Sequence, residues 1–235
     1  LLILRDTLAL NHLIRLAGES GLTVDRGKTF VGVDPAVRCA LIYRDTERIG
    51  IDESIALNLR SFPDGYAKRK MAVDEKLKKI VIDITNRYPG RNIKLVPMHY
   101  FHAGDDDRMF LNQIAQDLGC GSLTVQNIPL TLRETIGVFQ ETRLKVGMRF
   151  HAILLQTILN GNNYVLDYAE PKQGKIYGFL KDIDPAGFYD NRYTNVQNDA
   201  ASPLLIEGEG TRFPLDQSLL ERKMEIYGRK LKALA

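Results

Sequence analysis

The stretch RLKVGMRFHAILLQTILNGNNYVLDY, residues 143–168, carries the pattern that decides the fold. Residues 143–148 predict a strand, and residues 151–160 predict a helix that ends at Gly161. A second strand is expected at 163–168. Strand, helix and strand at this spacing predict two parallel strands joined by a helical crossover.

The same alternation continues on both sides of this unit. Further strands are expected at 1–4, 54–60, 92–99 and 122–125. Helices are expected after the cap residue Asp6, over the apolar spacing from Val73 to Ile84, after the acidic residues 104–107, after the capping box at 131–134, and over 216–235. Residues 21–39 predict short strands and turns, and polar residues 44–53 predict a linker. The fold class is therefore α/β, with a doubly wound parallel sheet and helices on both faces.

Composition narrows the class of protein. The 235 residues are 44% hydrophobic and 26% charged, which is ordinary for a globular chain. A net charge of +3 is too small to argue for nucleic acid. Cys39 and Cys120 lie far apart, so neither a disulfide framework nor a zinc knuckle is indicated, and we expect a reducing, cytoplasmic compartment.

The sequence shows neither a membrane span nor a secretory signal peptide. No apolar stretch approaches the roughly 18 residues of a membrane span, and residues 1–10 lack the basic region and cleavage site of a signal peptide. The chain begins with leucine, directly on a predicted strand. We therefore expect it to be a fragment of a longer protein.

Polar residues follow each predicted strand, where parallel α/β sheets bind their ligands. These groups are Arg60, residues 99–107, residues 149–151 and residues 168–175. Arg149 and His151 lie at a junction between strand and helix, where free N–H groups favour an anion. A guanidinium adds a bidentate fork, and a histidine exchanges protons near neutral pH. The alternative is structural, with the arginine paired to an aspartate and the histidine bonded to a carbonyl.

Other groups allow two interpretations. Arg60 could bind the same ligand as Arg149, or it could be a solvated or paired residue at a strand end. His99, His102 and the aspartates at 105–107 are residue types that bind zinc or manganese, although helix capping explains two of the acids. We therefore assign no metal. The basic C-terminal helix could touch an anionic membrane surface, or it could simply be solvated.

Several common motifs do not occur in the sequence. It contains no GxGxxG, Walker P-loop, GxSxG or HExxH pattern. This argues against dinucleotide oxidoreductases, P-loop ATPases, serine hydrolases and zincins.

The segment VGMRFHAILLQTILNG, followed by a strand and YAEPKQGKIYGFL, resembles the polysaccharide pyruvyl transferases. Their C-terminal domain carries a G-x-R-L-H-A element at a strand–helix junction and then a Y-D-P-K-like segment. IALNLRSF, LVPMHYFHAGDDDRMFLNQIAQDL and LRDTLALNHLIRLAG are similar to further family segments, in order along most of the chain. The sequence departs from the family at Phe150, which replaces leucine, in residues 160–172, which lack G-V-P and a tight Y-D-P-K, and at 7–11, which lack the expected serine.

The resemblance implies a GT-B-like architecture, in which two Rossmann-like domains face one another across a ligand cleft. Residues 1–48 would be the end of a truncated N-terminal Rossmann-like domain. Residues 49–215 would be the C-terminal Rossmann-like domain, and residues 216–235 would be the C-terminal helix.

The resemblance also implies a reaction, in which a pyruvyl group moves from phosphoenolpyruvate to two sugar hydroxyls, giving a cyclic ketal and phosphate. Arg60 and Arg149 would clamp the donor, and His151 would protonate its methylene carbon. A hydroxyl would then attack, phosphate would leave, and a second hydroxyl would close the ring. His99 or a carboxylate of residues 105–107, with Asp107 as the candidate, would orient or deprotonate the acceptor. Catalytic residues would be His151 and Arg149; substrate-binding residues would be Arg60, Arg149, Phe150, His99, Asp107, Tyr168 and Lys172.

This scheme needs no metal or organic cofactor. The acceptor would be a sugar, a glycolipid or a polysaccharide repeat. The location would be the cytoplasm, and a location at the inner face of the membrane is an alternative. Two alternatives remain: a GT-B glycosyltransferase that uses a nucleotide-sugar donor, and a non-catalytic fragment that only binds. The acceptor sugar, the oligomeric state and the identity of the general base stay open.

Overall fold

A computed structural model describes residues 1–46, 50–62, 67–101, 105–198 and 210–232. Its centre is a six-stranded sheet in which every neighbouring pair is parallel, in the order β5-β4-β3-β6-β7-β8. The strands are β3 (Asp52–Asn58), β4 (Ile93–Leu95), β5 (Leu123–Val125), β6 (Thr142–Gly147), β7 (Asn163–Asp167) and β8 (Tyr193–Asn195). The predicted parallel sheet is confirmed.

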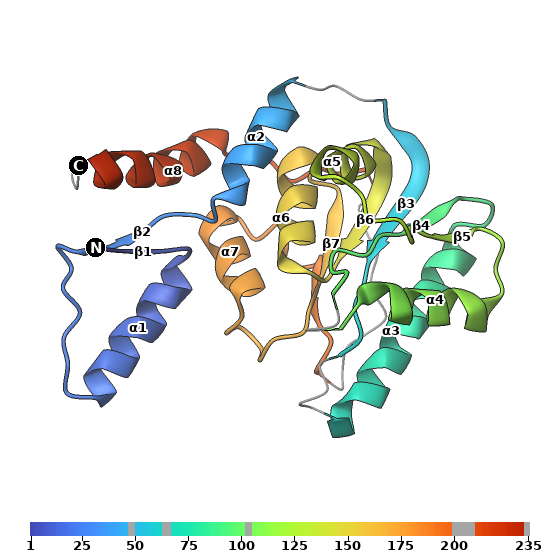
Figure 1. The fold of residues 1–235 in the computed structure, drawn as a ribbon, viewed down its shortest axis with the longest axis horizontal. Coiled ribbons are helices and arrows are strands. Elements are labelled where there is room, and N and C mark those ends of the chain that lie inside the picture. Colours follow the sequence, from blue (N-terminus) through green and yellow to red (C-terminus); the bar gives the residue numbers. More distant parts are fainter. Residues whose placement is uncertain (47–49, 63–66, 102–104, 199–209, 233–235) are drawn as a thin grey trace.

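Helices cover both faces of this sheet, as predicted (Figure 1). One face packs on α3 (Ala67–Arg87) and α4 (Asp107–Leu118). The other packs on α2 (Ala36–Thr46), α5 (Leu132–Glu141), α6 (Phe150–Leu159) and α7 (Lys175–Ile183). Central strands are buried on both faces, because Ile55 and Leu57 contact one helical layer while Ala56 contacts the other.

A second, smaller sheet pairs β1 (Leu2–Leu4) with β2 (Thr29–Val31) in parallel. Between them runs α1 (Thr7–Glu19), which has no buried residue and whose N-cap is Asp6, as predicted. This unit lies at one end of the molecule, where α8 (Gln217–Lys232) also runs (Figure 1). Tyr227 of α8 donates a hydrogen bond to the Val33 carbonyl at 2.7 Å, and the Lys230 ammonium lies 3.9 Å from the Phe30 ring centre.

Several predicted boundaries differ from the structure. Helix α2 occupies residues predicted as turns and linker, and it packs on α6, so this part of the predicted N-terminal segment joins the larger core. Helix α7 and strand β8 were not predicted. Strand β3 ends at Asn58, which places Arg60 after the strand. Residues 47–49, at the predicted boundary between domains, lie outside the described residues, and the division into domains stays a prediction.

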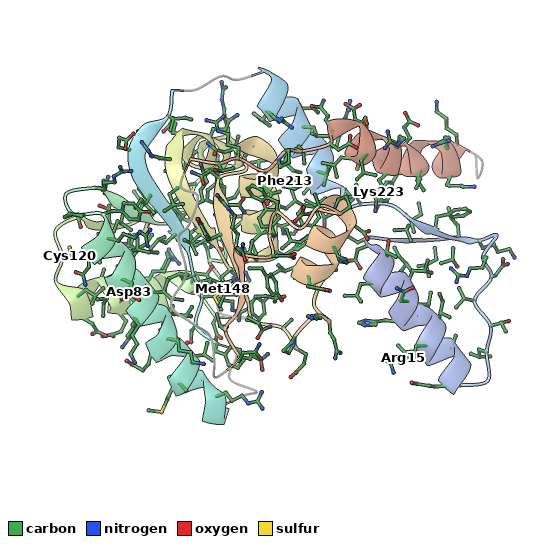
Figure 2. All side chains as sticks on the ribbon, turned by 180° about the vertical axis from the view of Figure 1, so that it is seen from behind. Arg15, Asp83, Cys120, Met148, Phe213 and Lys223 are labelled. Atoms are coloured by element: carbon green, nitrogen blue, oxygen red, sulfur yellow. The ribbon has the colours of Figure 1, made fainter. Side chains whose placement is uncertain are left out.

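None of the helices in the described ranges is long and apolar enough to cross a membrane. Figure 2 shows Met148, the residue before Arg149, in the middle of the larger body, whereas Arg15 on α1 lies at the far end of the molecule. The junction between β6 and α6 is therefore central to the fold.

A lysine lies inside the sheet layer. Lys145 of β6 is fully buried, and its ammonium donates to the Thr142 carbonyl. Burial and the nearby charge of Arg212 lower the pKa of Lys145 to about 7, against an opposing effect of Asp52. The unfolded chain holds this proton up to about pH 10.5, so between these values the unfolded state binds more protons than the folded state.

We therefore expect the free energy of unfolding to rise with pH above 7, by at most about 1.4 kcal/mol per pH unit, and to be lowest below pH 7, where the buried charge is present. Lys145→Met should raise stability at pH 6 and reduce this slope. Urea unfolding at pH 6, 7, 8 and 9 measures both effects. The exposed Lys79→Met is the control. Parallel pH profiles for Lys145→Met and the parent chain would contradict the assignment.

Candidate functional site

Strands β3 and β6 lie side by side although eighty-odd residues separate them in sequence, and Asn58 is paired with Gly147 at their ends. The chain runs outward from β3 through β4 and β5, returns to the centre at β6, and runs outward again through β7 and β8. After β3 it leads to α3 on one face, and after β6 it leads to α6 on the other. Such a topological switch point is where open α/β sheets form a ligand crevice.

Asn58 joins three strand ends at this point. Its side-chain amide donates to the Val96 carbonyl at 2.9 Å, and its oxygen accepts from the backbone N–H groups of Arg149 at 2.8 Å and Met148 at 3.4 Å. The residue is fully buried. Asn58 is not among the predicted site residues, although a polar residue near the end of an apolar strand was an available signal.

Arg149 is the N-cap residue of α6, and its guanidinium lies against Asp107, the first residue of α4. The contact is bidentate, with Nη2 at 2.5 Å from Oδ1 and Nε at 3.2 Å from both carboxylate oxygens. Oδ2 of Asp107 also accepts from the backbone N–H groups of Met98 and His99 at 3.0 and 3.1 Å. A 1% exposed carboxylate thus fixes the loop after β4 and the start of α6 together.

Arg60 follows β3 and lies near Asp105, two residues before Asp107. Its side chain is 9% exposed, its Nη2 lies 3.9 Å from Oδ2 of Asp105, and its guanidinium carbon lies 5.2 Å from the Tyr168 ring centre. Nη2 of Arg149 lies 3.4 Å from the Asp105 carbonyl oxygen. The structure therefore brings Arg60 and Arg149 to Asp105, which has a left-handed backbone with φ of 64°, and places the Tyr168 ring against Arg60.

His151 belongs to a second group of residues. Its side chain is 58% exposed and its Nε2 lies 3.6 Å from Oδ2 of Asp34, just before α2. Burial opposes ionisation of Asp34, but the contact with His151, the hydrogen bond from the Ala36 N–H and the charge of Arg5 outweigh it and lower the pKa of Asp34 below its ordinary value. Asp34 was not predicted as a site residue.

Phe150 lies between the two groups. It is 3% exposed, packs edge-on against Phe179, and carries the cations of Arg5 and Lys175 at 4.8 and 5.4 Å from its ring centre. As placed, it packs beneath the surface and offers a ligand almost no area. Asp107 is equally inaccessible, because its carboxylate is occupied by Arg149 and by the loop after β4.

The remaining predicted residues lie on loops of the same sheet edge. His99 is half-buried, with its ring edge-on to Phe101 at 5.6 Å, and its carbonyl accepts from the Asp107 N–H at 3.0 Å. Lys172 is exposed in the loop between β7 and α7 and has φ of 62°. Their roles, like those of the other site residues, stay predictions.

In the loop that carries Lys172 and leads into α7, the backbone at Gly174 lies close to Ala169. A side chain at Gly174, the N-cap of α7, would lie 2.4 Å from Cβ of Ala169. Asp167, at the end of β7, is buried, and this burial raises its pKa despite hydrogen bonds from the Ala169 N–H and the Tyr193 hydroxyl. Because Ala169 lies so close to position 174, glycine is required there, where α7 begins beside the sheet edge.

The metal alternative concerned His99, His102 and the aspartates that follow. His102 lies outside the described residues. Among the residues that are described, no group of three or more histidines, cysteines or acids is placed to hold a metal ion. Asp106 caps α4 by accepting from the Arg108 N–H at 3.0 Å, and Asp107 faces Arg149 instead.

Comparison with known proteins gave only weak structural likeness. No family model and no curated protein matches the chain. Three solved structures are similar: a UDP-forming α,α-trehalose-phosphate synthase from Burkholderia xenovorans (9% identity, 83% of this chain and 50% of that one, TM-score 0.48), the N-terminal domain of Candida albicans trehalose-6-phosphate phosphatase (9%, 98% and 54%, 0.48), and a trehalose-6-phosphate synthase, OtsA (12%, 87% and 51%, 0.49). The chain spans about half the length of each, and at these TM-scores the likeness carries no argument about activity.

Proposed function

We propose that this chain is the donor-binding half of a GT-B-type transferase, and that the switch point binds the phosphate groups of an activated donor. The first candidate donor is a nucleoside-diphosphate sugar, and the acceptor is a sugar hydroxyl. The observation that carries the proposal is that Arg60, which follows β3, and Arg149, which follows β6, both approach Asp105.

Helix α6 supports the same interpretation. It begins at Arg149, whose side chain makes no capping hydrogen bond, so the first N–H groups of the helix have no side-chain acceptor at this cap. Free N–H groups at a helix start stabilise phosphate, and Arg149, whose Nε and Nη2 are bonded to Asp107, adds Nη1 as a further donor. The predicted anion site and the helix start thus coincide.

The charge of the cluster favours an extended diphosphate over a compact trianion. Arg60 and Arg149 are accompanied by Asp105 and Asp107, and the carboxylate of Asp107 is bonded directly to Arg149. This leaves little net positive charge for phosphoenolpyruvate, which concentrates a carboxylate and a phosphate on three carbons. A diphosphate between two neutral groups needs less positive charge from side chains, because the N–H groups at the helix start also stabilise its negative charge.

Pyruvyl transfer from phosphoenolpyruvate is the second candidate. The residues RFHA at the start of α6 favour it, as does the exposure of His151 beside Asp34, which suits a group that exchanges protons with substrate. In pyruvyl transfer His151 would protonate the donor. In glycosyl transfer the same imidazole would accept the proton of the acceptor hydroxyl. His151 is the acid–base residue of the proposal in either case.

Donor binding separates the two candidates. We expect UDP or GDP to raise the melting temperature of the chain, and Arg60→Gln to weaken nucleotide affinity by roughly tenfold or more, because a hydrogen bond to a charged group contributes roughly 1.5–3 kcal/mol. Thermal shift and isothermal titration measure both effects. The control is Arg15→Gln, which removes an exposed guanidinium on α1.

Stabilisation by phosphoenolpyruvate but by neither nucleotide would replace the first candidate with the second. Absence of binding by all three compounds, or equal affinities in Arg60→Gln and the parent chain, would contradict a donor site at the switch point.

His151→Ala tests the acid–base assignment in the protein that contains this chain. Turnover should fall by roughly 10²- to 10⁴-fold, the usual contribution of a positioned acid or base. The melting temperature should change little, because the side chain is mostly exposed. His12→Ala on α1 controls for loss of an imidazole elsewhere. A folded His151→Ala protein with normal turnover would remove His151 from the mechanism.

A further inference from the structure

A cavity of about 450 Å³ opens beside α3, on the side of the sheet away from α6. Helix α3, the loop after β7 and the segment after β8 each contribute to its wall. The lining residues are Arg69, Ala72, Val73, Lys76, Glu170, Pro171, Gln197 and Asn198.

This cavity adjoins the switch-point site through Tyr168. The Gln197 side chain, which lines the cavity, donates to the Tyr168 carbonyl at 2.7 Å. The Tyr168 ring in turn lies 5.2 Å from the guanidinium carbon of Arg60. Tyr168 therefore contacts both a residue that lines the cavity and Arg60 of the switch-point site.

The lining combines three kinds of chemistry. Arg69 and Lys76 supply positive charge, and both are held in place, with Arg69 donating to Oε1 of Gln197 at 3.0 Å and Lys76 donating to the Asn198 carbonyl at 2.9 Å. Glu170 supplies a carboxylate that accepts hydrogen bonds. Ala72, Val73 and Pro171 supply an apolar surface.

Each part matches one feature of a phosphorylated sugar. A carboxylate accepts from adjacent hydroxyls, the apolar residues suit the C–H face of a sugar ring, and two cations against one acid leave a net positive charge for a phosphate. Pockets that bind small molecules commonly combine an apolar lining with a few polar groups in this way.

We propose that this cavity binds a sugar phosphate, with Glu170 accepting from the hydroxyls and Arg69 and Lys76 facing the phosphate. The proposal rests on the proposed transferase function, because it places a second part of the substrate next to the donor phosphate site. Two sources share this chemistry: the ribose phosphate of a nucleotide and a phosphorylated hexose.

The test is isothermal titration of the full chain with four probes: ribose 5-phosphate, glucose 1-phosphate, glucose and inorganic phosphate. We expect at least one sugar phosphate to bind roughly tenfold or more tightly than glucose and than inorganic phosphate. Preference for ribose 5-phosphate would assign the cavity to a nucleotide, and preference for glucose 1-phosphate would assign it to a hexose phosphate.

Variants on the cavity wall provide the matched comparison. Lys76→Gln should weaken the sugar phosphate by roughly tenfold, and Glu170→Gln should weaken it without weakening inorganic phosphate. Lys79→Gln removes the same charge from an exposed position of α3 and should change nothing.

Three results would overturn the proposal: inorganic phosphate binding as tightly as the sugar phosphates, Lys76→Gln having no effect, or Lys79→Gln having the same effect as Lys76→Gln. Sugar-phosphate binding without any binding of UDP, GDP or phosphoenolpyruvate would retain the cavity and reject the proposed donor site.

Discussion

The bond between Asp107 and Arg149 is the interaction on which the candidate site depends. An arginine at the start of an apolar helix brings a charge to the edge of the core, where desolvation is costly unless a partner compensates it. Asp107 provides that partner with a bidentate contact and also holds two N–H groups of the loop after β4. One carboxylate thereby sets the position of the α6 start relative to the loop after β4.

This arrangement gives the two arginines of the switch point different roles. Arg149 is fixed and largely neutralised, so it shapes the helix start and offers its remaining donors toward Asp105. Arg60 donates from Nε to the Ser61 carbonyl at 3.1 Å, but its Nη2 has a long contact of 3.9 Å with the Asp105 carboxylate, and the guanidinium lies over the Tyr168 ring. Arg60 is therefore the residue better placed to exchange its present neighbour for a ligand anion.

Much of the fold could be predicted from the sequence, because the strongest elements carry local signals. The capping box at Thr131 and Glu134 forms as expected, and so does the Asp6 cap of α1. Helix α2 was missed because its polar residues after Arg44 resemble a linker, although Asp34 accepts from the Ala36 N–H at the helix start. Helix α7 begins at Gly174 with no side-chain cap, and β8 has three residues, so neither carries a clear signal.

The site was predictable only in part, for a similar reason. The positions of Arg60 and Arg149 after neighbouring strands follow from the parallel topology. The partner of Arg149 does not follow from the topology. Three consecutive aspartates lie at 105–107, and the local sequence does not distinguish which of them caps α4. The structure shows that Asp106 caps the helix while Asp107 turns inward. That choice depends on packing between segments 42 residues apart.

A double-mutant cycle of Asp107→Asn and Arg149→Gln, measured by urea unfolding, tests this central interaction most directly. Asparagine keeps an acceptor for the loop N–H groups, so the cycle isolates the charge pair. Each single variant should lose about 3–5 kcal/mol of unfolding free energy, and the double variant should lose little more than either, giving a coupling of about 2 kcal/mol or more. Additive losses, with a coupling below about 0.5 kcal/mol, would contradict the claim that this pair holds the site together.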